Sequence, residues 1–291
     1  IIIPSFIVLF VLLLLVPIIG IEVKGSKRWL DFNLFRLQPI ELVKPFFILL
    51  VSKILTQDKN KILNTSYLFS FFILFSIIIL LINQPDLGQA ILLTGTWIAM
   101  VFISGIRIFY IFSFFGLSLS ALTGLLFLFP EKFGYITKRL STFFDPSSGD
   151  SFQTQKALDA IKQGGLTGQG MGEGILKDNV PEAHTDYIIA VISEEFGSII
   201  SILLIIIFIY IALRIIKFTI SELDNSIKIS LCGFSTLLIF QTFIHIGVNT
   251  SLLPTTGMTL PFLSYGGSSL LGSSILAGFI LNYTKNSFSH D

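Results

Sequence analysis

The sequence is poor in charged residues and in cysteine, and both shortages narrow the class of protein. Lys, Arg, Asp and Glu make up 13% of the 291 residues, about half their share in a soluble domain. A net charge of +1 without a dense basic cluster argues against a nucleic-acid partner. The single cysteine, Cys232, excludes an internal disulfide and a cysteine-based metal site.

Hydrophobic residues are abundant instead, at 53% of the chain with 30 Phe. Apolar runs long enough to cross a hydrocarbon layer of about 30 Å recur along the sequence. We therefore expect an all-α polytopic membrane protein, with residues 1–291 forming a single transmembrane domain. Eight spans are predicted, at residues 1–20, 38–56, 64–84, 87–106, 108–129, 185–216, 227–250 and 258–284.

Two connections are long, residues 21–37 and residues 130–184. Eight spans would put both termini on one side, and the short connections and tail on that side carry Lys53, Lys59, Lys61, Arg107, Arg214, Lys217, Lys228 and Lys285. The positive-inside rule then places both long connections outside, 130–184 being a large extracytoplasmic loop. Within it, GDSFQTQKALDAIKQGG predicts a helix capped by Asp150 or Ser151, with Leu158 and Ile161 on one face and Gly164 at its end.

The stretch PEAHTDYIIAVISEEFG, residues 181–197, carries polar residues into an apolar run. Thr185 or Asp186 could cap a helix that begins at residue 187, since an anion suits a helix N-terminus. Asp186 could also act as a general base, with His184 beside it as orienter or hydrogen-bond donor. The two roles are compatible.

Glu194 and Glu195 lie inside the following span, where ionisable side chains are costly and usually face the protein interior. An interior ion pair is favoured over proton transfer for one of them, with Lys44 as a candidate partner. Lys44 also follows Glu41 by three positions in QPIELVKP, so these two side chains share a helix face and could form a structural salt bridge.

Cations in the two outer loops are candidates for binding an anion. GSKRWLDF, residues 25–32, contains Arg28, whose fork matches phosphate geometry, beside Trp29, a typical interface anchor. Lys138 and Arg139 offer the same charge in the second loop. The alternative is that these loop cations are simply solvated.

Two glycine-containing stretches need separate interpretations. GGLTGQGMGEG, residues 164–174, is not a nucleotide-binding motif, because no strand precedes it; a flexible turn is the simpler interpretation, and amides that cradle a phosphate are the alternative. LPTTGMTLPFLSYGGSS, residues 253–269, breaks the last apolar region with Pro254, Gly257 and Pro261. Such backbone survives at membrane depth only when buried in protein or lining a cavity. The polar stretch NQPDLGQA, which contains Asp86, predicts a tight outer connection between two spans.

Metal ligands are scarce. The three histidines, His184, His245 and His290, are far apart in the sequence, and we assign no metal-ligating residue.

Taken in chain order, several stretches resemble the SEDS family, the shape, elongation, division and sporulation proteins of bacteria. They are GSKRWLDF, LQPIELVK, NQPDLGQA, RLSTFFDPSSGDSFQTQKAL, GGLTGQGMGEG, PEAHTDYIIAVISEEFG and GVNTSLLPTTGMTLPFLSYGGSS. The residues in these motifs are most similar to those of the family's division branch in alphaproteobacteria. Ile40 departs from the Ser that the family usually has there. The family has ten transmembrane helices, so this chain is expected to lack two at its N-terminus; it begins at Ile1, inside an apolar run, and not with a signal peptide.

The resemblance implies a peptidoglycan glycosyltransferase that polymerises lipid II at the outer face of the cytoplasmic membrane, at the division septum. It places the family's catalytic aspartate on Asp186. It also implies a class B penicillin-binding protein and other divisome proteins as partners. The candidate substrate-binding residues are Arg28, Trp29, Glu41, Lys44, Lys138, Arg139, His184 and Thr185.

One base would be enough for this chemistry. Glycoside hydrolysis usually needs a second carboxylate that protonates the leaving oxygen, but undecaprenyl diphosphate leaves as a stable anion that needs countercharge. Asp186 would accept the proton from the 4-hydroxyl of the acceptor sugar, whose oxygen attacks the donor's anomeric carbon with inversion. Loop cations, or a divalent cation that shares the task, would screen the diphosphate. Because aspartate is a weak base, positioning must supply most of the rate.

Two other functions fit parts of the sequence. A lipid II flippase would use the broken backbone near 254–261 and the interior carboxylates, and it would depend on Glu194 or Glu195 more than on Asp186. A non-enzymatic divisome scaffold would tolerate Asp186→Asn, provided that the partner is still bound.

Overall fold

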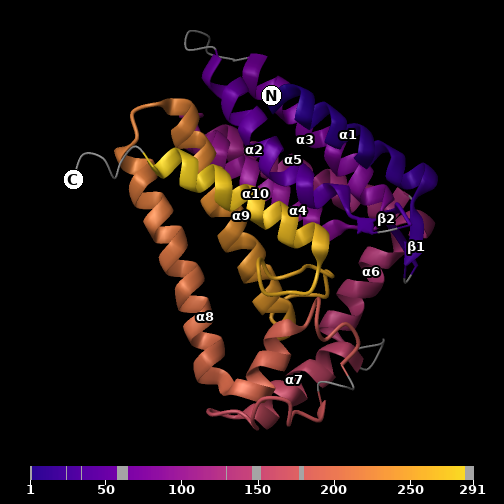
Figure 1. Ribbon diagram of the computed structural model, residues 1–291. Coiled ribbons are helices and arrows are strands. Elements are labelled where there is room, and N and C mark those ends of the chain that lie inside the picture. Colours follow the sequence, from indigo (N-terminus) through magenta and orange to yellow (C-terminus); the bar gives the residue numbers. More distant parts are fainter. Residues whose placement is uncertain are drawn as a thin grey trace. The chain divides into compact units, whose positions relative to one another are not determined.

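The computed structural model describes residues 2–23, 25–33, 35–57, 65–128, 130–145, 152–176 and 180–285. Its helices are α1 (Ile2–Ile19), α2 (Pro39–Gln57), α3 (Thr65–Asn83), α4 (Leu87–Ile103), α5 (Ile108–Leu128), α6 (Pro130–Phe144), α7 (Phe152–Gly164), α8 (Ile188–Ser221), α9 (Asn225–Asn249) and α10 (Gly267–Thr284) (Figure 1). The strands are β1 (Ile21–Val23), β2 (Ser26–Asp31) and β3 (Arg36–Leu37). The chain forms two compact units, residues 1–106, 210–240 and 266–291 in the first, and residues 107–209 and 241–265 in the second.

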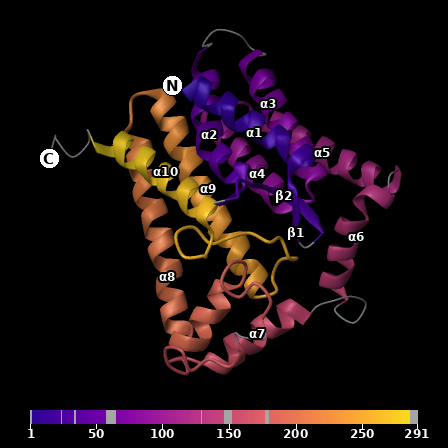
Figure 2. The same cartoon turned by 45° about the vertical axis from the view of Figure 1, so that its right-hand side comes forward.

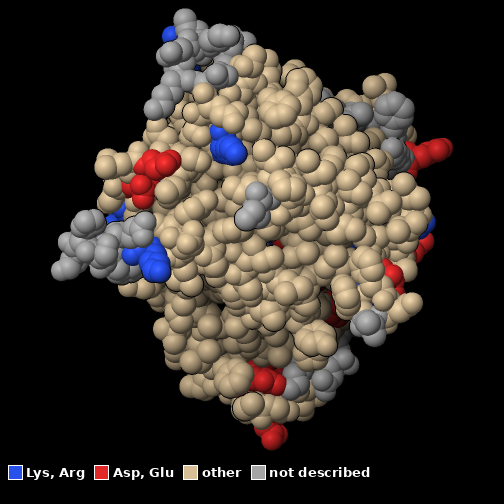
Figure 3. Space-filling view, turned by 45° about the horizontal axis from the view of Figure 1, so that its top comes forward, with Lys and Arg blue, Asp and Glu red and all other residues tan. Residues whose placement is uncertain are grey.

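Each of the eight predicted spans contains a helix, and all but the last lie close to their expected bounds. Four helices, α1, α3, α8 and α9, are long and apolar enough to cross a membrane, among the residues that the structure describes. Large apolar side chains such as Val8, Phe72 and Tyr210 are exposed along them. On the face seen in Figure 3, charged side chains are sparse among broad uncharged surface, as a hydrocarbon environment requires. The number of crossings stays a prediction.

Three features differ from the predicted elements. The last helix begins at Gly267 and not at residue 258, because residues 250–266 are non-helical, with Phe262 at a φ of 64°. The outer connection 21–37 contains a small antiparallel sheet, with β2 between β1 and β3. The large loop begins with a helix, α6, that was not predicted. The α7 helix was predicted, but its fully buried face is made by Ala157, Ala160 and Gly164, and the proposed caps Asp150 and Ser151 lie outside the described residues.

In the first unit α2 is the central helix. It packs against α1, α3, α4 and α10, and most of its side chains are buried. A Cβ on Gly272 of α10 would lie 2.4 Å from the carbonyl oxygen of Glu41, so α10 approaches α2 at backbone distance. The sheet continues from α1 and leads into α2, and Figure 2 shows β1 and β2 at one end of α1.

In the second unit α8 is interrupted at Gly197, which has a φ of 86° and a ψ of 167°. A break of this kind frees backbone groups from the helical hydrogen-bond pattern. The glycine-rich loop satisfies them: Gln169 and Gly170 donate to the carbonyls of Glu194 and Glu195 at 2.9 and 3.0 Å. In return, the amides of Ser198 and Ile199 donate to the carbonyls of Gly165 and Leu166 at 3.0 and 3.4 Å. Figures 1 and 2 show α7, which leads into this loop, beside the bent end of α8.

Close backbone approach explains the glycines of this loop. A Cβ on Gly168 would lie 2.2 Å from the carbonyl oxygen of Glu195, and one on Gly197 would lie 2.1 Å from that of Leu166. The amides of Gly168, Gln169, Gly170 and Glu173 all donate within the protein, so they are not available to cradle a phosphate. The loop is a packing element joined to α8.

Candidate active site

The polar segment before α8 is held by its main chain. Three successive carbonyls accept hydrogen bonds: that of His184 from the Tyr265 amide at 2.8 Å, that of Thr185 from the Ser264 hydroxyl at 2.6 Å, and that of Asp186 from the Asn249 side-chain amide at 3.0 Å. We call this set, residues 184–186 with Asn249, Ser264 and Tyr265, the carbonyl clasp. It joins the segment to the end of α9 and to the non-helical stretch after it.

The cap of α8 comes from a distant residue. The side-chain oxygen of Asn249 accepts from the amide of Ala190 at 3.2 Å, in the first turn of α8. The hydroxyl of Thr185, predicted as a local cap, instead donates back to the carbonyl and carboxylate of Glu182, at 3.2 and 2.7 Å. The Ala190 amide also donates to the carbonyl of Tyr187 at 2.9 Å, so Asn249 adds a second acceptor for this amide from α9.

Tyr187, the residue after Asp186, has a buried phenol on which the charges of Asp186 and Arg139 both act. Tyr187 is 2% exposed, and its hydroxyl has no hydrogen-bond partner among the described residues. Both the Asp186 carboxylate and the Arg139 guanidinium lie within electrostatic range of this phenol. A half-buried carboxylate and a cation therefore both lie within electrostatic range of one buried ring.

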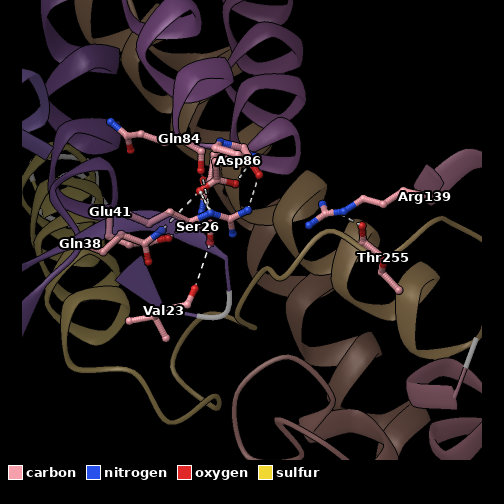
Figure 4. Close-up of polar contacts among 11 residues, drawn as sticks. Val23, Ser26, Gln38, Glu41, Gln84, Asp86, Arg139 and Thr255 are labelled. Atoms are coloured by element: carbon pink, nitrogen blue, oxygen red, sulfur yellow. Dashed lines mark hydrogen bonds and ion pairs between the residues drawn. The ribbon is translucent and has the colours of Figure 1, made fainter. Parts of the chain in front are cut away.

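A pocket of about 340 Å³ opens beside Arg139. It is lined by α6, α7 and residues 251–255, with Lys138 and Arg139 as its cations. Arg139 donates to the carbonyl of Thr255 at 3.2 Å, which anchors the guanidinium at the pocket wall (Figure 4), and Lys138 is exposed. The lining also includes polar residues: Thr142, Thr154 and Thr255, which have hydroxyls, and Gln155, which has an amide. Paired cations with polar neighbours suit a phosphate-bearing group.

The first unit contains a buried polar cluster. Arg28 on β2 donates to the carbonyl of Gln84 at 3.1 Å and to that of Pro85, and its Nε lies 3.7 Å from the carboxylate of Asp86. Asp86 is 1% exposed, caps α4 through the Gln89 amide, and accepts from Gln38 at 3.4 Å (Figure 4). Burial raises the pKa of Asp86, while Arg28 lowers it. The Asp86 turn is thus a buried junction and more than a tight connection.

Glu41 and Lys44 form the salt bridge that their spacing allows, at 2.7 Å and almost fully buried. The second carboxylate oxygen of Glu41 accepts from Gln89 at 2.7 Å. The partner suggested for Glu194 therefore pairs with Glu41. The carboxylate of Glu194 is fully buried in the second unit and accepts from the amide of Leu176 at 2.8 Å, holding the end of the glycine-rich loop.

The predicted site residues are divided between the units. Arg28, Trp29, Glu41 and Lys44 belong to the first, and Lys138, Arg139, His184, Thr185 and Asp186 to the second. Their roles in binding and catalysis stay predictions. Asn249 and Tyr187 were missed, although an Asn at the end of an apolar helix is the kind of buried polar residue that signals a function. No cluster of three His, Cys, Asp or Glu side chains suited to a metal ion occurs among the described residues.

The fold and this site define a class: a helical, polytopic membrane protein with a polar site built at a helix end. The chain matches the model of the cell cycle protein family of FtsW, RodA and SpoVE over residues 1–288, and it belongs to that family. The resemblance to the SEDS family is thereby confirmed, and so is the expected fold class.

Individual relatives agree. The probable peptidoglycan glycosyltransferase FtsW of Caulobacter vibrioides is 37% identical over 91% of this chain and 67% of its own length. The stage V sporulation protein E of Bacillus subtilis is 37% identical over 94% and 76%, and FtsW of Escherichia coli O157:H7 is 33% identical over 90% and 64%. The chain thus spans about two-thirds to three-quarters of these relatives.

Solved structures show the same fold. A chain of a peptidoglycan synthase complex, described as coordinating polymerization and crosslinking, matches with a TM-score of 0.79 and 25% identity, over 97% of this chain and 81% of that one. RodA, the rod shape determining protein of Thermus thermophilus, matches with a TM-score of 0.66 and 24% identity, over 97% and 77%.

Proposed function

We propose that this protein is a peptidoglycan glycosyltransferase that polymerises lipid II into glycan strands during cell division. Relatives that share a third or more of its residues over most of the chain are named as probable enzymes of this kind. The observation that carries the proposal is the placement of Asp186: a half-buried carboxylate at the start of α8, whose main-chain carbonyl accepts a hydrogen bond from Asn249.

In this reaction Asp186 accepts the proton of the acceptor sugar's 4-hydroxyl as that oxygen attacks the anomeric carbon of the donor. The bond between that carbon and the diphosphate oxygen breaks, with inversion, and undecaprenyl diphosphate leaves as an anion. A fixed base is needed because aspartate is weak and the rate depends on geometry. The hydrogen bonds of the carbonyl clasp supply such fixing to the residue's main chain.

Countercharge for the diphosphate comes from Lys138 and Arg139 in the pocket formed by α6, α7 and residues 251–255. Preorganised cations stabilise charge that develops in the transition state. Arg28, Glu41 and Lys44 have charged protein partners of their own, and Arg28 and Lys44 balance Asp86 and Glu41. This balance favours a supporting role for Arg28, Glu41 and Lys44 over direct contact with the substrate. A divalent cation held jointly with the substrate phosphates could share the charge.

We further propose that the enzyme works in the bacterial cytoplasmic membrane at the septum, with its site on the extracytoplasmic face. A class B penicillin-binding protein and other divisome proteins are the expected partners. The resemblance to a chain of a peptidoglycan synthase complex supports an assembly with a crosslinking enzyme, and the basic residues of the short connections support the orientation.

The test compares wild type, Asp186→Asn and Glu182→Gln in the full-length protein purified with its penicillin-binding partner. Glu182, four positions away, is exposed, and glutamine there keeps a side-chain oxygen that can accept from the Thr185 hydroxyl, so Glu182→Gln serves as the matched control. Labelled lipid II is supplied with and without Mg²⁺ or Mn²⁺, and glycan polymer is measured on a gel. Loss of a general base predicts a fall of about 10²–10⁴-fold in rate for Asp186→Asn, while Glu182→Gln stays near wild type.

Equal polymer from wild type and Asp186→Asn would remove Asp186 from the mechanism. No polymer from any protein, under every metal condition, would favour the flippase or the scaffold. Transport of lipid II that depends on Glu194 would then point to the flippase.

A further inference from the structure

We infer that Asn249 is the positioning residue for Asp186, and this inference rests on the proposed function. Asn249 is the last residue of α9 and is 0% exposed. Its side chain makes three hydrogen bonds, two through the amide nitrogen and one through the oxygen. The nitrogen donates to the carbonyls of Asp186 and His245 at 3.0 and 2.8 Å, and the oxygen accepts from Ala190 at 3.2 Å.

Two of these bonds hold the chain at Asp186 and one turn after it. One bond holds the carbonyl of Asp186 itself, and another holds an amide four residues later in the first turn of α8. The peptide plane at Asp186 and the start of the helix axis are therefore set by one rigid side chain. Aspartate has only two rotatable side-chain bonds, so the position of its backbone limits the places that its carboxylate can reach.

The end of α9 is itself well fixed. The carbonyl of His245 accepts from Asn249, and the ring of His245 is hydrogen-bonded to the carbonyl of Met258 at 2.8 Å. Gln241, one turn earlier, donates to the carbonyl of Thr259 at 2.9 Å. The non-helical stretch after α9 is thereby tied back to that helix, and its Ser264 and Tyr265 complete the carbonyl clasp.

An asparagine suits this place for a chemical reason. The carbonyls of Asp186 and His245 accept from Asn249 and the Ala190 amide donates to it, and a primary amide supplies both functions within one planar group. Aspartate has the same shape but, when ionised, only accepts, so it would face two carbonyl oxygens. Leaving a buried acceptor without its donor is unfavourable, and the segment at 184–186 would shift to regain one.

The experiment uses wild type, Asn249→Asp and Thr250→Val, each purified full-length with the penicillin-binding partner. Thr250 is the matched control, because its hydroxyl donates back to the carbonyls of Ile246 and Gly247 in α9. Three quantities are measured: kcat per lipid II-binding site, KM, and amide hydrogen exchange of the peptide that covers residues 183–192. Counting binding sites removes misfolded protein from the comparison.

We expect Asn249→Asp to lower kcat per binding site by about 10–100-fold, because small misplacements of a catalytic group have effects of this size. KM should change less than about twofold, since Asn249 does not contact substrate. Exchange in residues 183–192 should become faster, and Thr250→Val should match wild type in all three measurements.

Faster exchange with an unchanged kcat would overturn the positioning role and leave Asn249 as a stabilising residue only. Unchanged exchange would overturn the clasp itself. If Asn249→Asp yields no folded protein, Ser264→Ala tests the same kind of contact at the neighbouring carbonyl of Thr185. Unchanged exchange and an unchanged kcat in that variant would also overturn the inference. If wild type makes no polymer, the proposed function fails, while the exchange measurement still decides the clasp.

Discussion

Two aspartates that look alike in the sequence differ in their surroundings. Asp86 and Asp186 each precede a helix after a polar turn, and both could be caps. Asp86 is 1% exposed, caps α4 and lies near Arg28, whereas Asp186 is half-buried and its helix is capped by Asn249. Local spacing could predict the polar turns. It could not predict the burial, because Arg28 is more than 50 positions from Gln84 and Pro85, to which it donates.

The Arg28–Asp86 contact predicts a large cost for removing one member. Arg28→Met would leave the Asp86 carboxylate buried without its cation, which costs about 3–5 kcal/mol. The midpoint of thermal unfolding in detergent measures this loss. Arg36→Met is the matched control, because Arg36 and Asp31 form a pair at 3.5 Å in which the arginine is 62% exposed, and such pairs contribute less than about 1 kcal/mol. Equal shifts in the two variants would contradict the assignment of Arg28 to a buried cluster.

Among the elements, α8 departs most from its predicted form. The sequence shows one long apolar run, which correctly predicts a helix, and a glycine-rich stretch, which was interpreted as a flexible turn. The structure joins them: the break at Gly197 exposes backbone groups that the glycine-rich loop satisfies. Apolar periodicity carries no information on backbone pairing between segments some thirty positions apart. Helix α6 and the short strands were missed for a related reason, since their polar and apolar residues form no long run.

The glycine-rich loop allows a prediction with an internal control. Gly168 and Gly172 have similar φ values of 81° and 83°, but a Cβ would meet the Glu195 carbonyl at the first and nothing within 4 Å at the second. Alanine therefore imposes comparable backbone strain at both positions, and a steric clash at Gly168 alone. We expect Gly168→Ala to destabilise the protein by about 1–3 kcal/mol more than Gly172→Ala. Thermal unfolding and limited proteolysis within residues 164–176 measure the difference; equal behaviour of the two variants would refute the close packing.

For the whole molecule, composition and apolar runs predicted a helical membrane protein and the positions of its long helices. They did so because each span must satisfy its own backbone in hydrocarbon, which makes the signal local. The carbonyl clasp, the pocket and the buried cluster depend on contacts between distant segments, and no local signal encodes them.

The eight-span arrangement predicts that the two ends of α8 lie on opposite sides of the membrane. Met171, in the glycine-rich loop, is 82% exposed, and Leu223, after α8, is 95% exposed. In a Cys232→Ser background, Met171→Cys should react with a membrane-impermeant maleimide added outside, and Leu223→Cys should react only in inverted vesicles. The background protein alone should remain unlabelled. Reaction of both cysteines from the same side would disprove the arrangement.

The carbonyl clasp has a consequence for how the protein can change over generations. Every amino acid carries a main-chain carbonyl, so the contacts at His184 and Thr185 persist whatever side chains stand there. Drift at these two positions can therefore alter what the segment presents to its surroundings without dismantling its support. Asn249 has no such freedom, because its part is played by the side chain. Variants that escape an inhibitor bound at this site should accordingly arise first at His184 and Thr185 and last at Asn249.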